Sequence, residues 1–446
     1  MKLTKAFFTC TLASVMIFSG CSAQGTDNTT VDKPHEGIVY YMEPSGANGE
    51  MEDLIKRYNK YCMRELDDSY KIEIVNFESH DELFTRLAAE IMSGGGPDFF
   101  TLDQELPFEK MAENGCFYNI EELFNEYGNP DDNTLANCNQ NILNGLKTHG
   151  TQYFLPLFYG VDILQTDTGT MEQFGITLDC GETITYDKLE PTFRQFLNDQ
   201  QGYAFLWGDG DNYFGGTDML FAKLICDHVD FQNCETHFND PSFTEHLDIM
   251  GEILNSRRHL GRDNGFEKYL FDTWYWSQNI SARAMMSSGD NYSVFYPGIT
   301  LSENDVRAFV QLGVAVNKKS VHKDKLCAFL TYCLSEERQT TFCGDNEYSA
   351  SGGWGNISFP VNQRAFDHAV ENIEKNGYKL DNNEYMQKYI DTIKRANIVD
   401  KYLYPTDSYY YQKVIGSTVN DYLNGTIGQD KFIYRLTSET EIYLNE

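Results

Sequence analysis

Basic residues are scarce in this chain of 446 residues. It has 35 Lys and Arg against 67 Asp and Glu, which gives a formal net charge of −32. We expect no binding to nucleic acid or to an anionic lipid surface, because both would repel so acidic a chain. Beyond the N-terminal residues, no apolar run is long enough to cross a bilayer. Tryptophan is also rare, with four residues, although Tyr and Phe raise the aromatic content to 14%.

Common catalytic and nucleotide-binding motifs are absent as well. The sequence contains no Gly-x-Ser-x-Gly, no Gly-x4-Gly-Lys and no His-Glu-x2-His. A carboxylate pair for glycoside hydrolysis stays open, since 67 acidic residues make such pairs uninformative. We expect a protein that is not an enzyme and that needs no cofactor.

Metal sites have only weak support. The zinc-ligand residue types come together within twelve residues, at Cys226, His228, Cys234 and His237. Their spacing does not match a common zinc module. A local disulfide between Cys226 and Cys234, or buried thiols beside surface histidines, are the alternatives. A fragment that resembles a calcium loop, at Asp209, Asp211 and Asn212, has its Gly and Glu misplaced. We therefore expect no bound metal.

The N-terminus has the pattern of an export signal. Lys2 and Lys5 precede an apolar run over residues 6–18, too short to span a bilayer. The following Phe-Ser-Gly-Cys, ending at Cys21, resembles a bacterial lipobox, with an unusual Phe at its first position. This resemblance implies cleavage before Cys21 and a lipid such as palmitate on its sulfur. The alternative is an ordinary signal peptide with an incidental Cys. Residues 21–36 would form a flexible tether.

Loss of this signal would leave 33 basic and 67 acidic residues, a net charge of −34. It would also remove Cys10, and lipidation would use Cys21. Of the eleven cysteines, nine would remain, an odd number, so at least one is expected to be unpaired.

The best-defined helix-to-strand step lies within residues 79–103. Ser79 followed by Glu82 predicts a capping box at the start of a helix. The helix has one apolar stripe, made of Leu83, Phe84, Leu87, Ala88, Ile91 and Met92. The run Gly-Gly-Gly-Pro at 94–97 ends it, and residues 99–102 predict a short buried strand. Asp103 then follows the carboxyl end of that strand, where open α/β sheets bind ligands.

The segments before this step alternate in the same way. Residues 38–42 predict a strand, residues 51–61 a helix with an apolar face, and residues 72–76 a second strand. The resulting β-α-β-α-β order favours a doubly wound sheet.

Several motifs resemble bacterial extracellular solute-binding proteins of family 1, the sugar-binding lipoproteins of ABC transporters. The matching segments occur in the family's order from about residue 38 to 366. They are Gly94–Phe100, the Leu-Pro strand within Tyr153–Leu164, Phe309–Asn317 with Lys318-Lys319-Ser320 and Leu334-Ser335-Glu336-Glu337, Ser351-Gly352-Gly353, and Phe359-Pro360-Val361-Asn362.

This resemblance implies an α/β, two-lobed fold like that of periplasmic binding proteins, in which each lobe is a doubly wound sheet flanked by helices and hinge strands cross between the lobes. Crossings are expected near Tyr159, Leu312 and Ser351. After a signal peptide over residues 1–20, the N-terminal lobe would comprise 37–159 and 311–348. The C-terminal lobe would comprise 160–310 and 349–446.

The implied function is capture of a carbohydrate, such as an oligosaccharide, between the lobes, and its delivery to the permease of an ABC transporter. We expect a monomer held at the extracellular face of the membrane by its lipid. The alternatives are a surface glycoside hydrolase or lyase with paired carboxylates, or a glycan-capture lipoprotein without a transporter.

Candidate ligand contacts combine aromatic rings, which stack on the flat faces of sugars, with carboxylates that bind hydroxyls. The aromatic candidates in loops or beside glycine are Trp207, Tyr213, Trp276, Tyr292 and Trp354. Glu43 and Asp103 follow the first and third strands, and Tyr159 and Asp162 flank the first crossing.

Overall fold

The structure is a computed structural model. It describes residues 37–42, 49–102, 106–131, 133–198, 203–206, 217–258, 269–271, 293–344, 359–375, 383–402, 406 and 408–445. All of them belong to one compact unit, Gly37–Glu446. Within these ranges, no helix combines the length and the apolar character needed to cross a membrane.

One large mixed sheet organises the part of the molecule that contains the N-terminal elements. Its seven strands are β1 (Ile38–Met42), β2 (Ile72–Asn76), β3 (Phe99–Thr101), β4 (Phe154–Val161), β11 (Arg307–Val316), β12 (Phe359–Pro360) and β13 (Ile398–Asp400). They run in the order β12-β4-β11-β3-β1-β2, and β13 pairs with the start of β11. β1 is parallel to β2 and β3, whereas β11 is antiparallel to β3 and β4.

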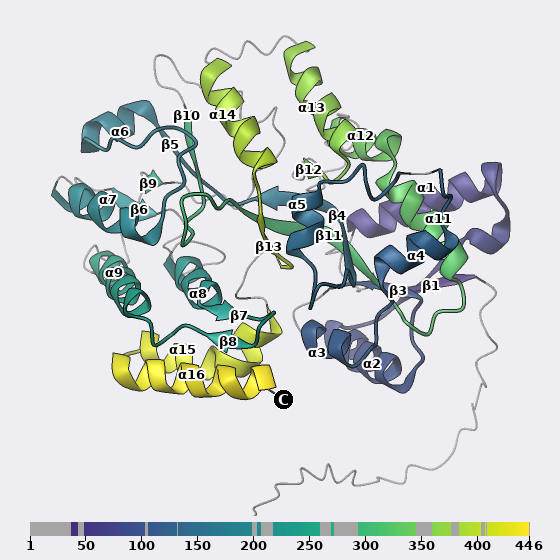
Figure 1. Ribbon diagram of the computed structural model, residues 1–446, viewed down its shortest axis with the longest axis horizontal. Coiled ribbons are helices and arrows are strands. Elements are labelled where there is room, and N and C mark those ends of the chain that lie inside the picture. Colours follow the sequence, from purple (N-terminus) through teal and green to yellow (C-terminus); the bar gives the residue numbers. More distant parts are fainter. Residues whose placement is uncertain are drawn as a thin grey trace, which may run out of the picture. The chain divides into compact units, whose positions relative to one another are not determined.

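Helices cover both faces of this sheet, as the predicted β-α-β-α-β order requires. They are α1 (Gly49–Glu65), α2 (His80–Ser93), α3 (Phe108–Glu113), α4 (Ile120–Tyr127), α5 (Gln140–Gly145), α11 (Lys323–Leu334), α12 (Glu336–Gly344), α13 (Gln363–Lys375) and α14 (Asn383–Lys394), with a short 3-10 helix η1 (Asp68–Tyr70). The connection through α1 leads from β1 outward to β2, and that through α2 leads back to β3. The two helices therefore lie on opposite faces (Figure 1).

The rest of the molecule is built mainly from helices around short strand pairs. Its helices are α6 (Thr168–Phe174), α7 (Tyr186–Asn198), α8 (Thr217–Asp227), α9 (Pro241–Arg258), α15 (Gly416–Leu423) and α16 (Gln429–Asn445), with a π-helix η4 (Tyr410–Ile415). The strand pairs are β5 (Ile163–Asp167) with β10 (Ser293–Pro297), β6 (Ala204–Leu206) with β9 (Tyr269–Phe271), and β7 (Val229–Asp230) with β8 (Glu235–Thr236).

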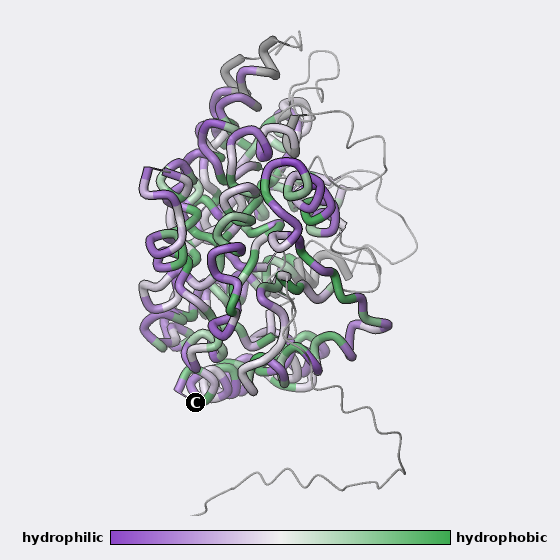
Figure 2. The backbone as a smooth tube through the Cα atoms, turned by 90° about the vertical axis from the view of Figure 1, so that its right-hand side faces the viewer, coloured by the Kyte–Doolittle hydropathy of each residue, from purple (hydrophilic) through white to green (hydrophobic). Residues whose placement is uncertain are grey.

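Two separate hydrophobic cores divide these elements. The first lies around the large sheet and α1–α5, α11, α13 and α14. The second joins α6–α9, η4, α15 and α16. We call the elements around them the first lobe and the second lobe. In Figure 2 the hydrophobic stretches run through the interior, and hydrophilic stretches dominate the periphery.

The step at residues 79–103 folds largely as its sequence predicts. The Ser79 hydroxyl accepts a hydrogen bond from the Glu82 amide at 3.2 Å, so Ser79 caps α2. Gly94 ends the helix in the left-handed conformation, at φ 85°, which glycine adopts without strain. Met92 departs from the predicted stripe, because its side chain is 74% exposed at the helix end.

The Gly-rich turn and the Lys-Lys-Ser turn, more than 200 residues apart in the chain, form one structural unit. The Asp98 carboxylate accepts hydrogen bonds from the Val39 amide (2.8 Å) and the Ser320 hydroxyl (2.6 Å). The Asn317 side-chain amide donates to the carbonyls of Gly95 and Pro97 at 2.7 and 2.9 Å. These bonds tie α2, β1 and β11 together, so these motifs act as scaffold.

The chain passes between the lobes at three described places. It leaves the first sheet between β4 and β5, returns between β10 and β11, and leaves again after β13 for η4. We predicted the third crossing near Ser351, within 349–361. The described part of that stretch stays in the first lobe: β12 pairs with β4, and Val361 belongs to the first core.

Close packing at the first passage makes a testable prediction. A Cβ atom on Gly160 would overlap the Phe309 ring of the neighbouring strand. We expect Gly160→Ala to lower the free energy of unfolding by about 1–3 kcal/mol, because the ring must shift in a full core.

Denaturation in urea measures this loss. The matched control is Gly251→Ala, within α9. A Cβ atom at this position would have no atom from other parts of the protein within 4 Å. This substitution should stabilise the protein by about 0.5–1 kcal/mol. Equal stability of the G160A variant and the parent would contradict the packing argument.

Candidate functional site

Buried ion pairs lie where the three passages leave the large sheet. Asp162 stands between β4 and β5, Arg307 begins β11, and Asp400 ends β13. Their partners, Lys223 and Asp227, come from α8 of the second lobe. These two residues are four positions apart and so share one face of the helix. This helix is therefore paired by charge with the first and second passages, and Arg307 links it to Asp400 at the third.

The first pair joins Asp162 to Lys223. Their side chains are 5% and 4% exposed, and the ammonium group bonds a carboxylate oxygen directly. The backbone amide of Asp162 also donates to the Arg307 carbonyl at 2.9 Å, and Gly298 donates to the Asp162 carbonyl at 2.7 Å. The first and second passages are thus hydrogen-bonded to each other at Asp162.

Arg307 is the centre of the second cluster. Its buried guanidinium donates to both Asp400 oxygens, at 3.1 and 2.9 Å, and to Asp227. Tyr186 completes the cluster by donating its hydroxyl to Asp227 at 3.1 Å. Burial raises the pKa of Asp227, although Arg307 favours its charged form. Such a cluster holds α8, β11 and β13 in one arrangement, since separating them would leave buried charges unpaired.

Two of the predicted ligand contacts lie among the described residues, and both are engaged within the protein. Tyr159 is 1% exposed; its ring lies 5.7 Å from that of Phe359, and its hydroxyl is 3.5 Å from the Asn139 side-chain amide. Asp162 is held by Lys223. As placed, both side chains support the passage between the lobes. Contact of either with a ligand stays a prediction.

The other predicted contacts lie outside the described residues. They are Glu43, Asp103, Trp207, Tyr213, Trp276, Tyr292 and Trp354. The same is true of Cys21, the predicted lipid site. Their proposed roles rest on the sequence.

Sequence reasoning missed several residues at the site. Lys223, Asp227 and Arg307 carry no motif, and their partners are 61, 80 and 93 residues away. Glu50 was missed as well. It lies in the first turn of α1, which follows the carboxyl end of β1, and burial raises the pKa of its carboxyl group. The sequence did offer one signal for Glu50: it is an acidic residue in the second position of a helix that directly follows a predicted strand.

The suspected zinc residues do not form a metal site. Cys226 and Cys234 are free thiols, so they form no disulfide. His228 is buried with Nδ1 2.8 Å from the Leu224 carbonyl, and His237 lies 3.5 Å from Asp240. Within the part of the chain that the structure describes, no three His, Cys, Asp or Glu residues are grouped to hold a metal. The calcium-like fragment at 209–212 lies outside that part.

Comparison with known proteins finds similarity in three-dimensional structure but not in sequence. No protein-family model matches the sequence, and no curated protein does so. Among solved structures, the Listeria monocytogenes ABC substrate-binding protein Lmo0181, in complex with cycloalternan, is similar with a TM-score of 0.58. The two are 14% identical, and the match covers 92% of this chain and 99% of that one.

Two further structures match over a comparable length. The cyclic α-maltosyl-1,6-maltose binding protein of Arthrobacter globiformis has a TM-score of 0.59 and 16% identity, over 92% of this chain and 98% of its own. A periplasmic oligogalacturonide binding protein of Yersinia enterocolitica has a TM-score of 0.56 and 13% identity, over 92% and 99%. The chain therefore has the two-lobed α/β fold of sugar-binding proteins of ABC transporters. The predicted two-lobed α/β fold is confirmed, whereas in the described residues the second lobe has two-stranded pairs in place of the doubly wound sheet predicted for it.

The buried pair at the first passage predicts a large loss of stability from Lys223→Met. Asp162 would then remain buried without its partner, and the free energy of unfolding should fall by about 3–5 kcal/mol. Adding Asp162→Asn, which removes the unpaired charge, should recover part of the loss.

Urea denaturation at neutral pH tests both variants. The control is Lys188→Met, whose ion pairs with Glu182 and Glu303 are far more exposed. Its loss should be about 0–1 kcal/mol. A K223M variant no less stable than K188M would refute a structural role for the buried pair.

The burial of His228 leads us to expect that the stability of the protein depends on pH. Burial lowers the pKa of its imidazole below the usual 6.5. At a pH between the lowered pKa of the folded protein and the usual pKa of the unfolded chain, the unfolded chain binds a proton that the folded protein does not. The free energy of unfolding therefore falls as the pH drops below about 7. His228→Asn should flatten the decline between pH 7.5 and pH 5.5 in urea denaturation. His237→Asn, at an exposed position, is the control and should retain it.

Proposed function

We propose that this protein is a lipid-anchored extracellular solute-binding protein that captures an oligosaccharide between its lobes. It would then deliver that sugar to the permease of an ABC transporter. The observation that carries the proposal is the match of about nine-tenths of the chain to a fold whose solved members include binders of cycloalternan, cyclic maltosyl-maltose and oligogalacturonide. These ligands differ in sugar and linkage, so the fold supports the class and not a particular sugar.

The mechanism follows from two cores joined at a few places. Each lobe has its own hydrophobic core, so each can move as a rigid body while the passages near Asp162, Arg307 and Asp400 adjust. A sugar that contacts both lobes would make all its contacts only when they are closed. It would thereby shift the population toward the closed form. No covalent bond changes in this cycle.

The sugar contacts are proposed at the residues that combine stacking with hydroxyl recognition. Trp207, Tyr292 and Trp354 are the leading aromatic candidates, and Glu43 and Asp103 the leading carboxylates. Both carboxylates follow strands of the large sheet at the edge where open α/β sheets bind ligands. Glu50 begins α1 at that same edge and joins them as a candidate.

Attachment and delivery complete the proposal. Lipidation at Cys21 and a tether over residues 21–36 would hold the binding lobes near the outer face of the membrane. A charge of −34 on the mature chain would keep it soluble and would disfavour polyanionic ligands. We propose lobe boundaries near residue 162, within 298–306 and between Asp400 and Tyr410.

A thermal-shift panel tests the function. Maltohexaose, chitohexaose and trigalacturonic acid are added to the purified protein, and the melting temperature is recorded. A ligand that binds only the folded form raises that temperature, by an amount that grows with its concentration. At about 100 times the dissociation constant, we expect stabilisation of about 2.7 kcal/mol. Trp207→Ala, Tyr292→Ala and Trp354→Ala should each reduce the shift.

Two controls decide between the alternatives. Tyr434→Ala, at a 73% exposed position on α16, should leave the shift unchanged. Chromatography of each sugar after incubation separates binding from hydrolysis, because a glycoside hydrolase or lyase would release shorter products. Released products would refute the binding-only function, and the absence of any shift across a wider panel would refute the carbohydrate assignment.

A further inference from the structure

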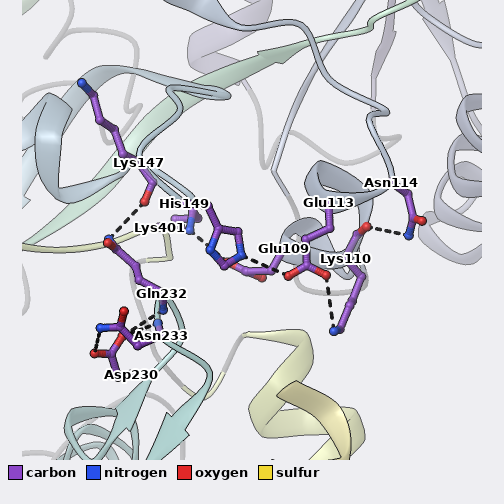
Figure 3. A network of polar contacts seen from close by, with 10 residues as sticks. All are labelled: Glu109, Lys110, Glu113, Asn114, Lys147, His149, Asp230, Gln232, Asn233 and Lys401. Carbon is purple, nitrogen blue, oxygen red and sulfur yellow. Dashed lines mark hydrogen bonds and ion pairs between the residues drawn. The ribbon is translucent and has the colours of Figure 1, made fainter. Parts of the chain in front are cut away.

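The two lobes also touch away from the passages. The contact surface joins α3 and the turn at residues 147–149, from the first lobe, to α16 and the β7–β8 turn, from the second lobe. Figure 3 shows most of its polar side chains, which form small groups joined by hydrogen bonds and ion pairs. Because the surface connects bodies with separate cores, its contacts must change when the lobes rotate.

The first contact joins α3 to α16. The Lys110 ammonium lies 5.5 Å from the centre of the Tyr443 ring, which is a favourable cation–π geometry. Tyr443 is 8% exposed. Burial raises the pKa of its hydroxyl, and the carboxylates of Glu109 and Glu113 on α3 raise it further. Tyr443 of the second lobe is therefore surrounded by charges of the first.

The second contact joins the β7–β8 turn to the first lobe. The Gln232 side-chain amide donates to the Lys147 carbonyl at 3.3 Å. The turn that presents Gln232 is shaped by Asp230, whose carboxylate accepts from the amides of Gln232 and Asn233, both at 2.9 Å. These bonds lower the pKa of Asp230 and keep it charged. The conformation of the turn is thus held by hydrogen bonds within the second lobe.

The first-lobe side is equally well supported. Glu113 bonds His149 at 3.2 Å and Lys110 at 3.4 Å, so it joins α3 to the 147–149 turn (Figure 3). Lys401 pairs with Glu109 at 2.9 Å, and it directly follows Asp400 at the third passage. The contact surface is therefore continuous with the ion pairs that hold the passages.

The position of α3 indicates which movement makes these contacts. β3 is parallel to β1, and α3 follows its carboxyl end. This is the edge at which open α/β sheets bind ligands and where the proposed function expects the sugar. On that function, contacts between the lobes at this edge would be made in the closed arrangement and would favour it.

We propose that the Lys110–Tyr443 and Gln232–Lys147 contacts form a latch that favours closure and strengthens sugar binding without touching the sugar. The inference rests on the proposed function. Lys110, Tyr443 and Gln232 are positioning residues here. Loss of one such contact should weaken binding about two- to tenfold, the range for a single cation–π pair or net hydrogen bond.

Small-angle scattering of the ligand-free protein tests the latch without any sugar. We expect Lys110→Met and Gln232→Ala to increase the radius of gyration, and the double variant to increase it most. Melting temperatures identify a variant that has simply lost its fold. Isothermal titration with maltohexaose, chitohexaose and trigalacturonic acid then measures the dissociation constants.

Matched controls keep the same chemistry within one lobe. Lys394 lies 5.5 Å from the ring of Phe366, and Gln140 donates to the Leu135 carbonyl at 2.8 Å, all inside the first lobe. Lys394→Met and Gln140→Ala should leave the radius and the affinity unchanged.

The outcomes separate the two proposals. An unchanged radius in both latch variants, or an expanded radius with undiminished affinity for a bound sugar, would overturn the latch. If the variants expand but none of the three sugars, nor any of a wider panel, binds the parent, the latch stands and the carbohydrate function fails.

Discussion

The charge network around α8 is the constraint on which the rest of the structure depends. Lys223 and Asp227 on one helix face pair with Asp162 and Arg307, and Arg307 also binds Asp400. Since buried charges are costly to separate, these pairs hold three distant segments at one place. The two cores lie on either side of these pairs, and the strand pair β5–β10 contributes apolar side chains to both of them.

This arrangement divides rigidity and motion in a way that suits ligand capture. Packing inside each lobe resists deformation, because protein interiors are close-packed. The passages, in contrast, are single strands and loops whose backbone angles can change. The contacts of Lys110 and Gln232 at the lobe surface are polar, few and individually weak. They can therefore bias an equilibrium between lobe arrangements, whereas the buried pairs keep the joint itself intact.

Local sequence signals predicted the first lobe well. The cap at Ser79, the stop at Gly94 and the alternation of strands and helices are short-range effects, so they can be recognised without the fold. The helix α2 and the strand β3 followed as expected. The third passage did not, because β12 and β13 are both short, and their pairing with the distant strands β4 and β11 keeps both of them in the first sheet. The candidate ligand contacts stay predictions, apart from the observed burial of Tyr159 and Asp162.

The sequence by itself determined the class of fold, the acidic character and the export pattern, since these depend on composition and on motifs a few residues long. The motifs around Asp98 and Asn317 were also recognisable in the sequence. That they join into one hydrogen-bonded unit was visible only in the structure. Only the tertiary structure decided that Arg307 is the joint and that Gln232 and Lys110 span the lobes. The physical reason is that a charge or an amide is common anywhere in a sequence. What it does depends on burial and on partners, and these are brought near by the fold alone.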